Sequence, residues 1–315
     1  MPVGRPLVFH EGGFMPLAEA KIGIMTHALH YGTSIFEGIR GNWNPDDGKL
    51  YIFRPADHYR RLLEGCHMLM IKLPYTADDL VRITIELVER NGFQEDIYIR
   101  PIAFKGAQKV ANLKLHELED SFALLAIPFG AYIDTQGAIR CCTSPWRRIE
   151  DTMIPPRFKI GGLYVNSILA KTDAVLAGFD EAILLTQDGH VSEGSGENLF
   201  LVKGGKLITP PVSDNILGGI TRDSVVQLAR NELGVETVER SIDRSEMYVA
   251  EEMFLTGTAA HLTPVGQVDH RLIGDGQVGT ITKALSDLYF GVIKGRNAKY
   301  KHWCAGVTVP KLIRV

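Results

Sequence analysis

The 315-residue sequence predicts an α+β fold with two domains, a smaller α/β domain at the N-terminus and a larger C-terminal domain with a barrel-like β-sheet. The length suits two hydrophobic cores, since a domain usually takes about 100–200 residues. Helix and strand patterns alternate up to residue 128, and short strands dominate after residue 137. We therefore place the domains at residues 1–128 and 137–315, joined by a linker at 129–136.

The first domain contains two clear helix patterns. We expect helices at 55–70 and 76–91, the second capped by Thr76 and closed by Asn91 and Gly92. Turn-forming residues at 44–48 predict a hairpin. The expected strands are 6–10, 35–42, 49–54, 97–104 and 121–128.

A polar segment at 105–120 separates the last two of these strands. Its charged side chains are expected in solvent, as is usual for lysines in loops. These lysines are Lys105, Lys109 and Lys114.

In the second domain, helix and strand patterns alternate less regularly. Helices are expected at 164–177, 221–233 and 279–294, the middle one from an apolar stripe at helical spacing. The tail at 305–315 carries no pattern that predicts an element. The expected strands are 137–144, 181–187, 198–203, 206–209, 235–240 and 251–255.

Charge and composition exclude several classes of function. Lysine and arginine number 34 against 37 aspartates and glutamates, so we expect no surface for nucleic acid. The longest apolar run, 122–129, is far shorter than the roughly 20 residues that span a membrane. The N-terminus lacks a signal-peptide pattern, and the four cysteines do not resemble a disulfide framework. A cytoplasmic protein is expected.

The most informative residue is Lys159, which follows Pro155 and Pro156 and precedes Gly161 and Gly162. The prolines exclude a helix interior, and the glycines let a flat ring approach the backbone closely. A lysine amine that is partly removed from water can form a Schiff base with an aldehyde, which indicates pyridoxal 5'-phosphate. A loop lysine taken alone is more often a solvated surface residue.

Other segments supply what that cofactor needs. Glu193 lies among small residues and could pair with the pyridine nitrogen, although alone it would be an ordinary turn carboxylate. Tyr164 opens an expected helix and could bond the ring oxygen, or else pack on the core. The segment 216–223 places two glycines before a helix, whose free N–H groups attract a phosphate. The glycine- and threonine-rich segment 255–260 could form a second cup.

Six segments together resemble the branched-chain amino acid aminotransferases, which are class IV aminotransferases of fold type IV. The resemblance covers almost the whole chain and keeps the order of the motifs. The segments are Tyr31-Gly-Thr-Ser-Ile-Phe-Glu-Gly-Ile-Arg-Gly41, Tyr98-Ile-Arg-Pro101, Lys159-Ile-Gly-Gly-Leu-Tyr164, Ser192-Glu-Gly-Ser-Gly-Glu-Asn-Leu-Phe200, Leu217-Gly-Gly-Ile-Thr-Arg-Asp223 and Gly257-Thr-Ala-Ala260.

The resemblance implies a role for each cofactor-binding residue. Lys159 would hold the cofactor and move the proton between the substrate and the cofactor, Glu193 would pair with the ring nitrogen, and Tyr164 with the ring oxygen. Arg61 matches the phosphate-binding arginine, with the adjacent Arg60 as the alternative. The cofactor is expected between the two domains, a common place for ligands. The other residues implied to bind it are Leu217, Gly219, Ile220, Thr221, Gly257 and Thr258.

Substrate recognition can be predicted in part from strand periodicity. A period of two puts Tyr98 and Arg100 on one face of their strand, and Phe36, Gly38 and Arg40 on one face of theirs. A mostly apolar face with a few polar groups suits a site that accepts both leucine-like side chains and glutamate.

The resemblance assigns these and further residues to the substrate. Tyr98, Thr258 and Ala259 would hold the α-carboxylate. The distal carboxylate of glutamate would meet Arg100, Tyr132 and Tyr31 of a second subunit, and the apolar pocket would be lined by Phe36, Gly38 and Phe129. For lone aromatic residues, core packing is the commoner role. Phe129 stands where many bacterial relatives carry tryptophan, and Arg157-Phe158 is bulkier than usual before the lysine, so side-chain preference is affected more than chemistry.

The expected reaction is the ping-pong transamination of L-leucine, L-isoleucine and L-valine with 2-oxoglutarate. The alternatives with the same fold are D-amino acid aminotransferases, R-selective amine transaminases and aminodeoxychorismate lyase; a cofactor-binding protein without activity is an alternative of another class. The faces around Gly38 and Tyr98 favour the branched-chain group. A homodimer at least is implied, and a hexamer built as a trimer of dimers is a further alternative.

Overall fold

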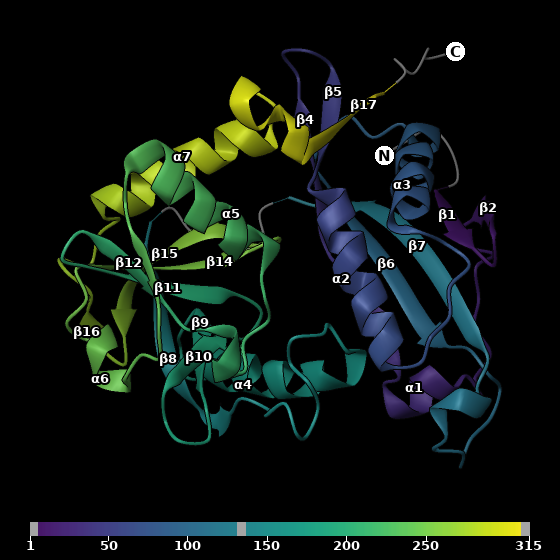
Figure 1. Cartoon of the computed structure of the whole chain (residues 1–315), viewed down its shortest axis with the longest axis horizontal. Coiled ribbons are helices and arrows are strands. Elements are labelled where there is room, and N and C mark those ends of the chain that lie inside the picture. The colour runs from purple at the N-terminus through teal and green to yellow at the C-terminus, as the bar shows by residue number, and fades with distance from the viewer. Residues whose placement is uncertain (1–5, 131–136, 310–315) are drawn as a thin grey trace. The chain divides into compact units, whose positions relative to one another are not determined.

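The computed structural model describes residues 6–130 and 137–309. The described chain forms two compact units (Figure 1). The first contains residues 6–130, 158–162 and 291–309, and the second contains 137–157 and 163–290. Each unit has helices and its own sheet, so the predicted α+β class with two domains is confirmed. Most of the predicted linker 129–136 lies outside the described residues.

The first unit is built on an eight-stranded antiparallel sheet in the order β17-β5-β4-β6-β7-β1-β2, with β3 paired to β6. Helices α2 (Pro55–Met68) and α3 (Ala77–Asn91) pack against each other and against this sheet (Figure 1). The short helix α1 spans His27–Tyr31. The strands are β1 (Leu7–His10), β2 (Gly13–Pro16), β3 (Ser34–Phe36), β4 (Ile39–Asn44), β5 (Lys49–Phe53), β6 (Ile97–Lys105), β7 (Asp120–Pro128) and β17 (Cys304–Thr308).

The predicted caps of α3 are confirmed. The hydroxyl of Thr76 accepts a hydrogen bond from the N–H of Asp79 at 3.2 Å, and the Asp79 carboxylate accepts one from the N–H of Thr76. Gly92 ends the helix at φ 67°, in the left-handed region that glycine adopts at little cost.

The single strand predicted at 35–42 is interrupted, and the cause is Pro101 on the facing strand. The N–H of Glu37 donates to the carbonyl of Pro101 at 3.0 Å, but proline has no N–H to return the bond. Pairing therefore stops at Glu37 and Gly38 and resumes in β4 with an unchanged register, Phe36 opposite Ile102 and Arg40 opposite Tyr98. The predicted shared face of Phe36, Gly38 and Arg40 is preserved.

The prediction that Lys105 lies in solvent is wrong. Lys105 ends β6 and is 1% exposed. Its Nζ contacts Asp120 Oδ1 and the carbonyl of Met70, both at 2.7 Å, so the buried charge is paired and hydrogen-bonded. Lys109 and Lys114 are exposed, as predicted.

The second unit is built on a nine-stranded mixed sheet that curls into a half-barrel, so the predicted barrel-like sheet is confirmed. Its order is β10-β9-β8-β15-β14-β11-β12-β13, with β16 paired to β15. The strands are β8 (Ile139–Arg147), β9 (Glu181–Leu185), β10 (Val191–Gly194), β11 (Asn198–Lys203), β12 (Lys206–Thr209), β13 (Thr237–Glu239), β14 (Glu252–Gly257), β15 (His261–Val268) and β16 (Arg271–Leu272).

Three helices of the second half follow the predicted positions closely. They are α4 (Tyr164–Leu176), α5 (Ile220–Leu228) with a π-helical turn at Ala229–Leu233, and α7 (Thr280–Ile293). The short helix α6 (Arg244–Met247) was not predicted. None of the helices in the described ranges is long and apolar enough to cross a membrane.

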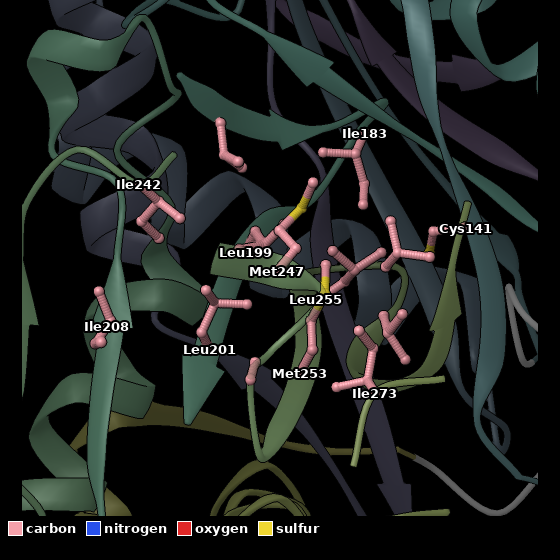
Figure 2. Packing of buried hydrophobic residues seen from close by; sticks show 14 of the residues in the cluster. Cys141, Ile183, Leu199, Leu201, Ile208, Ile242, Met247, Met253, Leu255 and Ile273 are labelled. Atoms are coloured by element: carbon pink, nitrogen blue, oxygen red, sulfur yellow. The ribbon is translucent and has the colours of Figure 1, made fainter. Parts of the chain in front are cut away.

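Side chains from facing strands fill the core of the second unit. Leu199 and Leu201 of β11 meet Met253 and Leu255 of β14, and Ile183 of β9 joins them (Figure 2). All five are at most 2% exposed, and each such burial contributes about 1.5–3 kcal/mol. This core holds the ends of β10 and β11, which carry the site residues of this unit.

Candidate active site

Lys159 is fixed by its backbone to strand β3. The carbonyl of Lys159 accepts a hydrogen bond from the N–H of Phe36 at 3.1 Å, and Ile160 forms a β-bridge with Ile35. The N–H of Gly162 donates to the carbonyl of Gly32 at 3.1 Å. The Lys159 Nζ lies 5.7 Å from the centre of the Phe36 ring. The lysine and the predicted substrate residue therefore lie together.

Tyr98, Arg100 and Phe36 form one surface, which confirms the predicted shared face of Tyr98 and Arg100. The Nη2 of Arg100 donates to the Tyr98 hydroxyl at 3.0 Å, and its guanidinium lies 4.3 Å from the centre of the Phe36 ring. Gly38 makes the arrangement possible, because a Cβ there would lie 2.0 Å from the Tyr98 hydroxyl. A cation on an apolar surface is suited to bind a carboxylate.

Phe129 and Arg40 extend this surface. The rings of Tyr98 and Phe129 lie 5.1 Å apart, and the Arg40 guanidinium lies 5.0 Å from the Phe129 ring. Arg40 is 4% exposed, and its Nη1 donates to the carbonyl of Gly130 at 3.0 Å. Arg40 therefore supports the backbone next to Phe129.

Arg61 is held by a glutamate that the sequence did not point out. Its Nε and Nη2 donate to the two carboxylate oxygens of Glu37 at 2.7 and 2.8 Å. The Nδ1 of His58 lies 2.7 Å from Glu37 Oε2. Arg60, the alternative to Arg61, has a 63% exposed side chain and pairs with Asp57 at the surface. The only sequence signal for Glu37 was a glutamate within an apolar strand pattern.

Glu193 of the second unit is buried and fully oriented. Its Oε1 pairs with Nη2 of Arg148 at 2.7 Å, and its Oε2 accepts hydrogen bonds at 3.1 Å from Asn198 Nδ2 and from the N–H of Leu217. Arg148 is 4% exposed. Sequence reasoning missed Arg148, which lies in a polar run after β8 with nothing to distinguish it from Arg147.

The segment before α5 is the one predicted to form a phosphate cup. Gly219 is the N-cap residue, no side chain caps the helix, and Thr221 is 3% exposed. A Cβ at Gly219 would lie 1.9 Å from Asn198 Oδ1, so this position requires glycine. Asn198 also donates to the carbonyl of Leu217 at 2.8 Å. The same asparagine therefore orders both the cup and Glu193.

The second predicted cup is the turn between β14 and β15. Gly257 ends β14, and Thr258 and Ala259 lie half-buried in the turn. The hydroxyl of Thr256 is buried, and no hydrogen-bond partner for it lies in the described ranges. The turn thus offers small side chains and hydroxyls.

Three predicted residues remain. Tyr164 is half-buried at the start of α4. Tyr31 is 42% exposed at the end of α1, and its hydroxyl accepts a hydrogen bond from the N–H of Ala111 at 2.9 Å. Tyr132 lies outside the described residues.

Similar proteins identify the family. The model of the family "Amino-transferase class IV" matches residues 34–268. A probable branched-chain-amino-acid aminotransferase of Aquifex aeolicus is 50% identical over 95% of this chain and 96% of its own length.

Solved structures agree. The branched-chain aminotransferase of Thermoproteus uzoniensis, solved with norvaline, is 41% identical at a TM-score of 0.91, over 96% of this chain and 99% of its own. The enzyme of Thermobaculum terrenum in its PLP form is 36% identical at a TM-score of 0.91, over 96% and 98%. The chain therefore belongs to the class IV aminotransferases and, within them, to the branched-chain-amino-acid aminotransferases.

Proposed function

We propose that this enzyme uses pyridoxal 5'-phosphate to transfer the amino group of L-leucine, L-isoleucine or L-valine to 2-oxoglutarate, with ping-pong kinetics. The products are branched-chain 2-oxo acids and L-glutamate. The observation that carries the proposal is the backbone bond between Lys159 and Phe36, because it sets the amine beside the surface of Phe36, Tyr98 and Arg100.

The residues present fit the cofactor. A protonated pyridine nitrogen needs a buried anion, and Glu193 supplies one oriented by Arg148 and Asn198. A phosphate needs N–H groups and hydroxyls, and the start of α5 supplies N–H groups without a capping side chain. When bound, the cofactor withdraws electrons from the α-carbon of the substrate.

The residues of this chain bind and orient the cofactor and the substrate. Lys159 would hold the cofactor and then move the proton at the substrate α-carbon, while Glu193 would accept a hydrogen bond from the ring nitrogen and Tyr164 would bond the ring oxygen. We assign the phosphate to residues that offer N–H groups, a hydroxyl or a guanidinium. They are Arg61, Leu217, Gly219, Ile220, Thr221, Gly257 and Thr258.

The substrate is recognised at both ends. We assign its α-carboxylate to Tyr98, Thr258 and Ala259. The Arg100 guanidinium, set on the Phe36 ring, would bind the distal carboxylate of glutamate, whereas a leucine side chain would contact the ring itself. We assign the same carboxylate also to Tyr132, which lies outside the described residues, and to Tyr31 of a second copy. Phe36, Gly38, Arg40 and Phe129 shape the pocket.

A homodimer is part of the proposal. Exposed apolar side chains gather before and within α1 of the first unit, beside a cavity of about 300 Å³ that Leu17, Ile22 and Leu29 line. This apolar surface consists of Ile22, Ile24, Met25, Leu29 and Tyr31, each between 42% and 78% exposed. Burying such a surface favours association. We propose that a second copy covers it and receives Tyr31.

Helix α4 of the second unit presents another exposed apolar stripe, at helical spacing. It comprises Val165, Ile168, Leu169, Val175 and Leu176. This stripe supports assembly beyond the dimer, such as a trimer of dimers. Light scattering tests both contacts. Leu29→Glu should give monomers, whereas Leu176→Glu should give dimers.

We also place the enzyme in the cytoplasm. Its four cysteines, Cys66, Cys141, Cys142 and Cys304, are all unpaired, which fits a reducing compartment. Immunofluorescence or fractionation of cells tests this placement.

The decisive experiment is a half-reaction panel. Holoenzyme is mixed separately with L-leucine, L-valine, D-alanine and R-1-phenylethylamine, and the visible absorbance of the lysine-bound cofactor is followed. Rapid loss of the band with the L-amino acids alone is expected. Rapid loss with D-alanine or the R-amine would reject the proposed substrates, and normal turnover by Lys159→Ala would reject the role of the lysine.

A further inference from the structure

Glu37 is a fully buried carboxylate, 0% exposed, that has no place in the proposed reaction. It lies in the interruption between β3 and β4. Both of its oxygens are engaged by residues of helix α2, by Arg61 at 2.7 and 2.8 Å and by His58 at 2.7 Å. A charge so far from water requires such partners, since an unpaired buried carboxylate is strongly destabilising.

The surroundings of Glu37 and His58 determine their protonation states. Burial alone would raise the pKa of Glu37, but the Arg61 charge and the hydrogen bonds from His58 and Arg61 outweigh it and hold that pKa well below its usual range. Burial lowers the pKa of His58, and together with the charges of Arg61 and Lys159 it outweighs the raising effect of the neighbouring Glu37. Near neutral pH, Glu37 is therefore a carboxylate, and a neutral His58 donates its Nδ1–H to it.

The geometry of the Arg61 pair fixes a plane. Two parallel bonds from Nε and Nη2 hold the guanidinium edge-on to the carboxylate, which a single bond would not do. An arginine on a helix surface otherwise samples many rotamers, and ordering it on binding lowers affinity.

The two neighbours of Glu37 make equally specific contacts. The N–H of Phe36 bonds the Lys159 carbonyl at 3.1 Å, and Gly38 leaves room for the Tyr98 hydroxyl. Three consecutive residues thus position the lysine, the arginine and the substrate tyrosine. A shift of Glu37 along the strand would alter all three.

We propose that Glu37 is a positioning residue that holds the guanidinium of Arg61 in the orientation in which it binds the cofactor phosphate. The inference rests on the proposed role of Arg61 and adds the group through which that role is enforced. Glu37 itself touches neither the substrate nor the cofactor in this role.

The test compares pyridoxal 5'-phosphate with pyridoxal, which lacks the phosphate. Apoenzyme is titrated with each compound by fluorescence. The measured quantity is the ratio of the dissociation constant of pyridoxal to that of pyridoxal 5'-phosphate, and it is determined for the wild type, Glu37→Gln, Arg61→Gln and the double variant. We expect Glu37→Gln to weaken phosphate-ester binding by about tenfold or more and pyridoxal binding by less than about twofold. The double variant should lose no more than Arg61→Gln alone, since the glutamate acts through the arginine.

Controls separate positioning from folding. Lys105→Met breaks another buried ion pair of the same unit, so it should lower the urea midpoint and leave the ratio unchanged. Glu37→Asp keeps the charge but shortens the reach to Arg61, so it should also reduce the ratio. It replaces Glu37→Gln in the test if that variant does not fold.

The outcomes are distinct. An unchanged ratio in Arg61→Gln would refute the phosphate role of Arg61 in the proposed function. A reduced ratio in Arg61→Gln with an unchanged ratio in Glu37→Gln and Glu37→Asp would overturn the role of Glu37 alone. Equal losses for both compounds in the Glu37 variants would make the residue merely structural and would also overturn the inference.

Discussion

Gly32 and Gly162 pack backbone against backbone, so closely that a Cβ on Gly32 would lie 2.7 Å from the Cα of Gly162. Gly162 also donates its N–H to the Gly32 carbonyl. Gly32 is the C-cap of α1, which ends in the exposed Tyr31, and Gly162 follows Lys159 by three residues. The helix that carries Tyr31 therefore sets the position of the lysine segment through this contact.

We expect Gly32→Ala to displace Lys159 and to lower kcat by about tenfold or more, because small misplacements of a reacting group are costly. The matched control is Gly92→Ala. Both glycines are helix C-caps at φ 67°, but a Cβ at Gly92 meets nothing within 4 Å. Both variants should lose about 1 kcal/mol of stability in urea from the left-handed backbone, and Gly32→Ala should lose more because its Cβ must also displace the Gly162 backbone. Equal kcat values for the two variants would show that the contact does not position Lys159.

Gly38 should be as sensitive as Gly32, but with a different kinetic result. A methyl group at this position would overlap the Tyr98 hydroxyl, which must then leave Arg100. Because Tyr98 and Arg100 are assigned to substrate carboxylates, Gly38→Ala should raise KM for L-leucine and 2-oxoglutarate by about tenfold and leave pyridoxal 5'-phosphate affinity unchanged. Gly13→Ala, in open space on β2, is the control. Steady-state kinetics decide, and an unaltered KM would contradict the assignment of Tyr98.

The sequence predicted relationships between residues that lie close together along the chain. Strand periodicity put Tyr98 and Arg100 on one face, and their 3.0 Å bond agrees. Strand periodicity could not predict β15, because Pro264 and Gly266 interrupt the apolar pattern of that strand. The missed strand β17 has only five residues and is stabilised by pairing with β5, far away in the sequence.

The partners of the site residues were missed for the same reason. Glu37 and Arg61 are 24 residues apart, and Arg148 lies on a different element from Glu193. Such ion pairs depend on how strands and helices meet in space, and no period in the chain encodes them. Lys105 begins a polar stretch of sequence that is typical of a loop. Its burial is explained only by its pairing with Asp120 across β6 and β7.

Arg148 should be essential for the stability of the second unit. Removing its charge takes away the guanidinium that lies 2.7 Å from the buried Glu193 carboxylate, and breaking comparable buried ion pairs costs about 3–5 kcal/mol. Arg148→Met should therefore lower the free energy of unfolding of the apoenzyme by about that amount. Glu193→Gln added to this variant should restore part of the loss, because the amide carries no charge. Urea titrations of both variants make the comparison, and an equally unstable double variant would contradict it.

Glu197 should make the stability of the second unit fall as the pH rises from about 4.5 to about 8. Burial, followed by the charge of Glu181, raises the pKa of Glu197 from its usual 4.5 to about 8. Between these two values the folded state binds a proton that the unfolded state has released. The free energy of unfolding therefore decreases as pH rises through this window, by up to about 1.4 kcal/mol per pH unit from this group.

Glu197→Gln isolates this contribution, because glutamine imitates the protonated acid and does not titrate. From pH 6 to pH 9, the unfolding free energy of the wild type should fall more steeply than that of Glu197→Gln, so that the variant becomes the more stable protein at pH 9. Glu64→Gln, at an exposed position on α2, should run parallel to the wild type and accounts for the loss of a surface charge. Urea midpoints measured at half-unit steps of pH resolve the difference. Parallel curves for the wild type and Glu197→Gln would mean that Glu197 is ionised in the folded protein, with Lys171 neutralising the pair of carboxylates through Glu181.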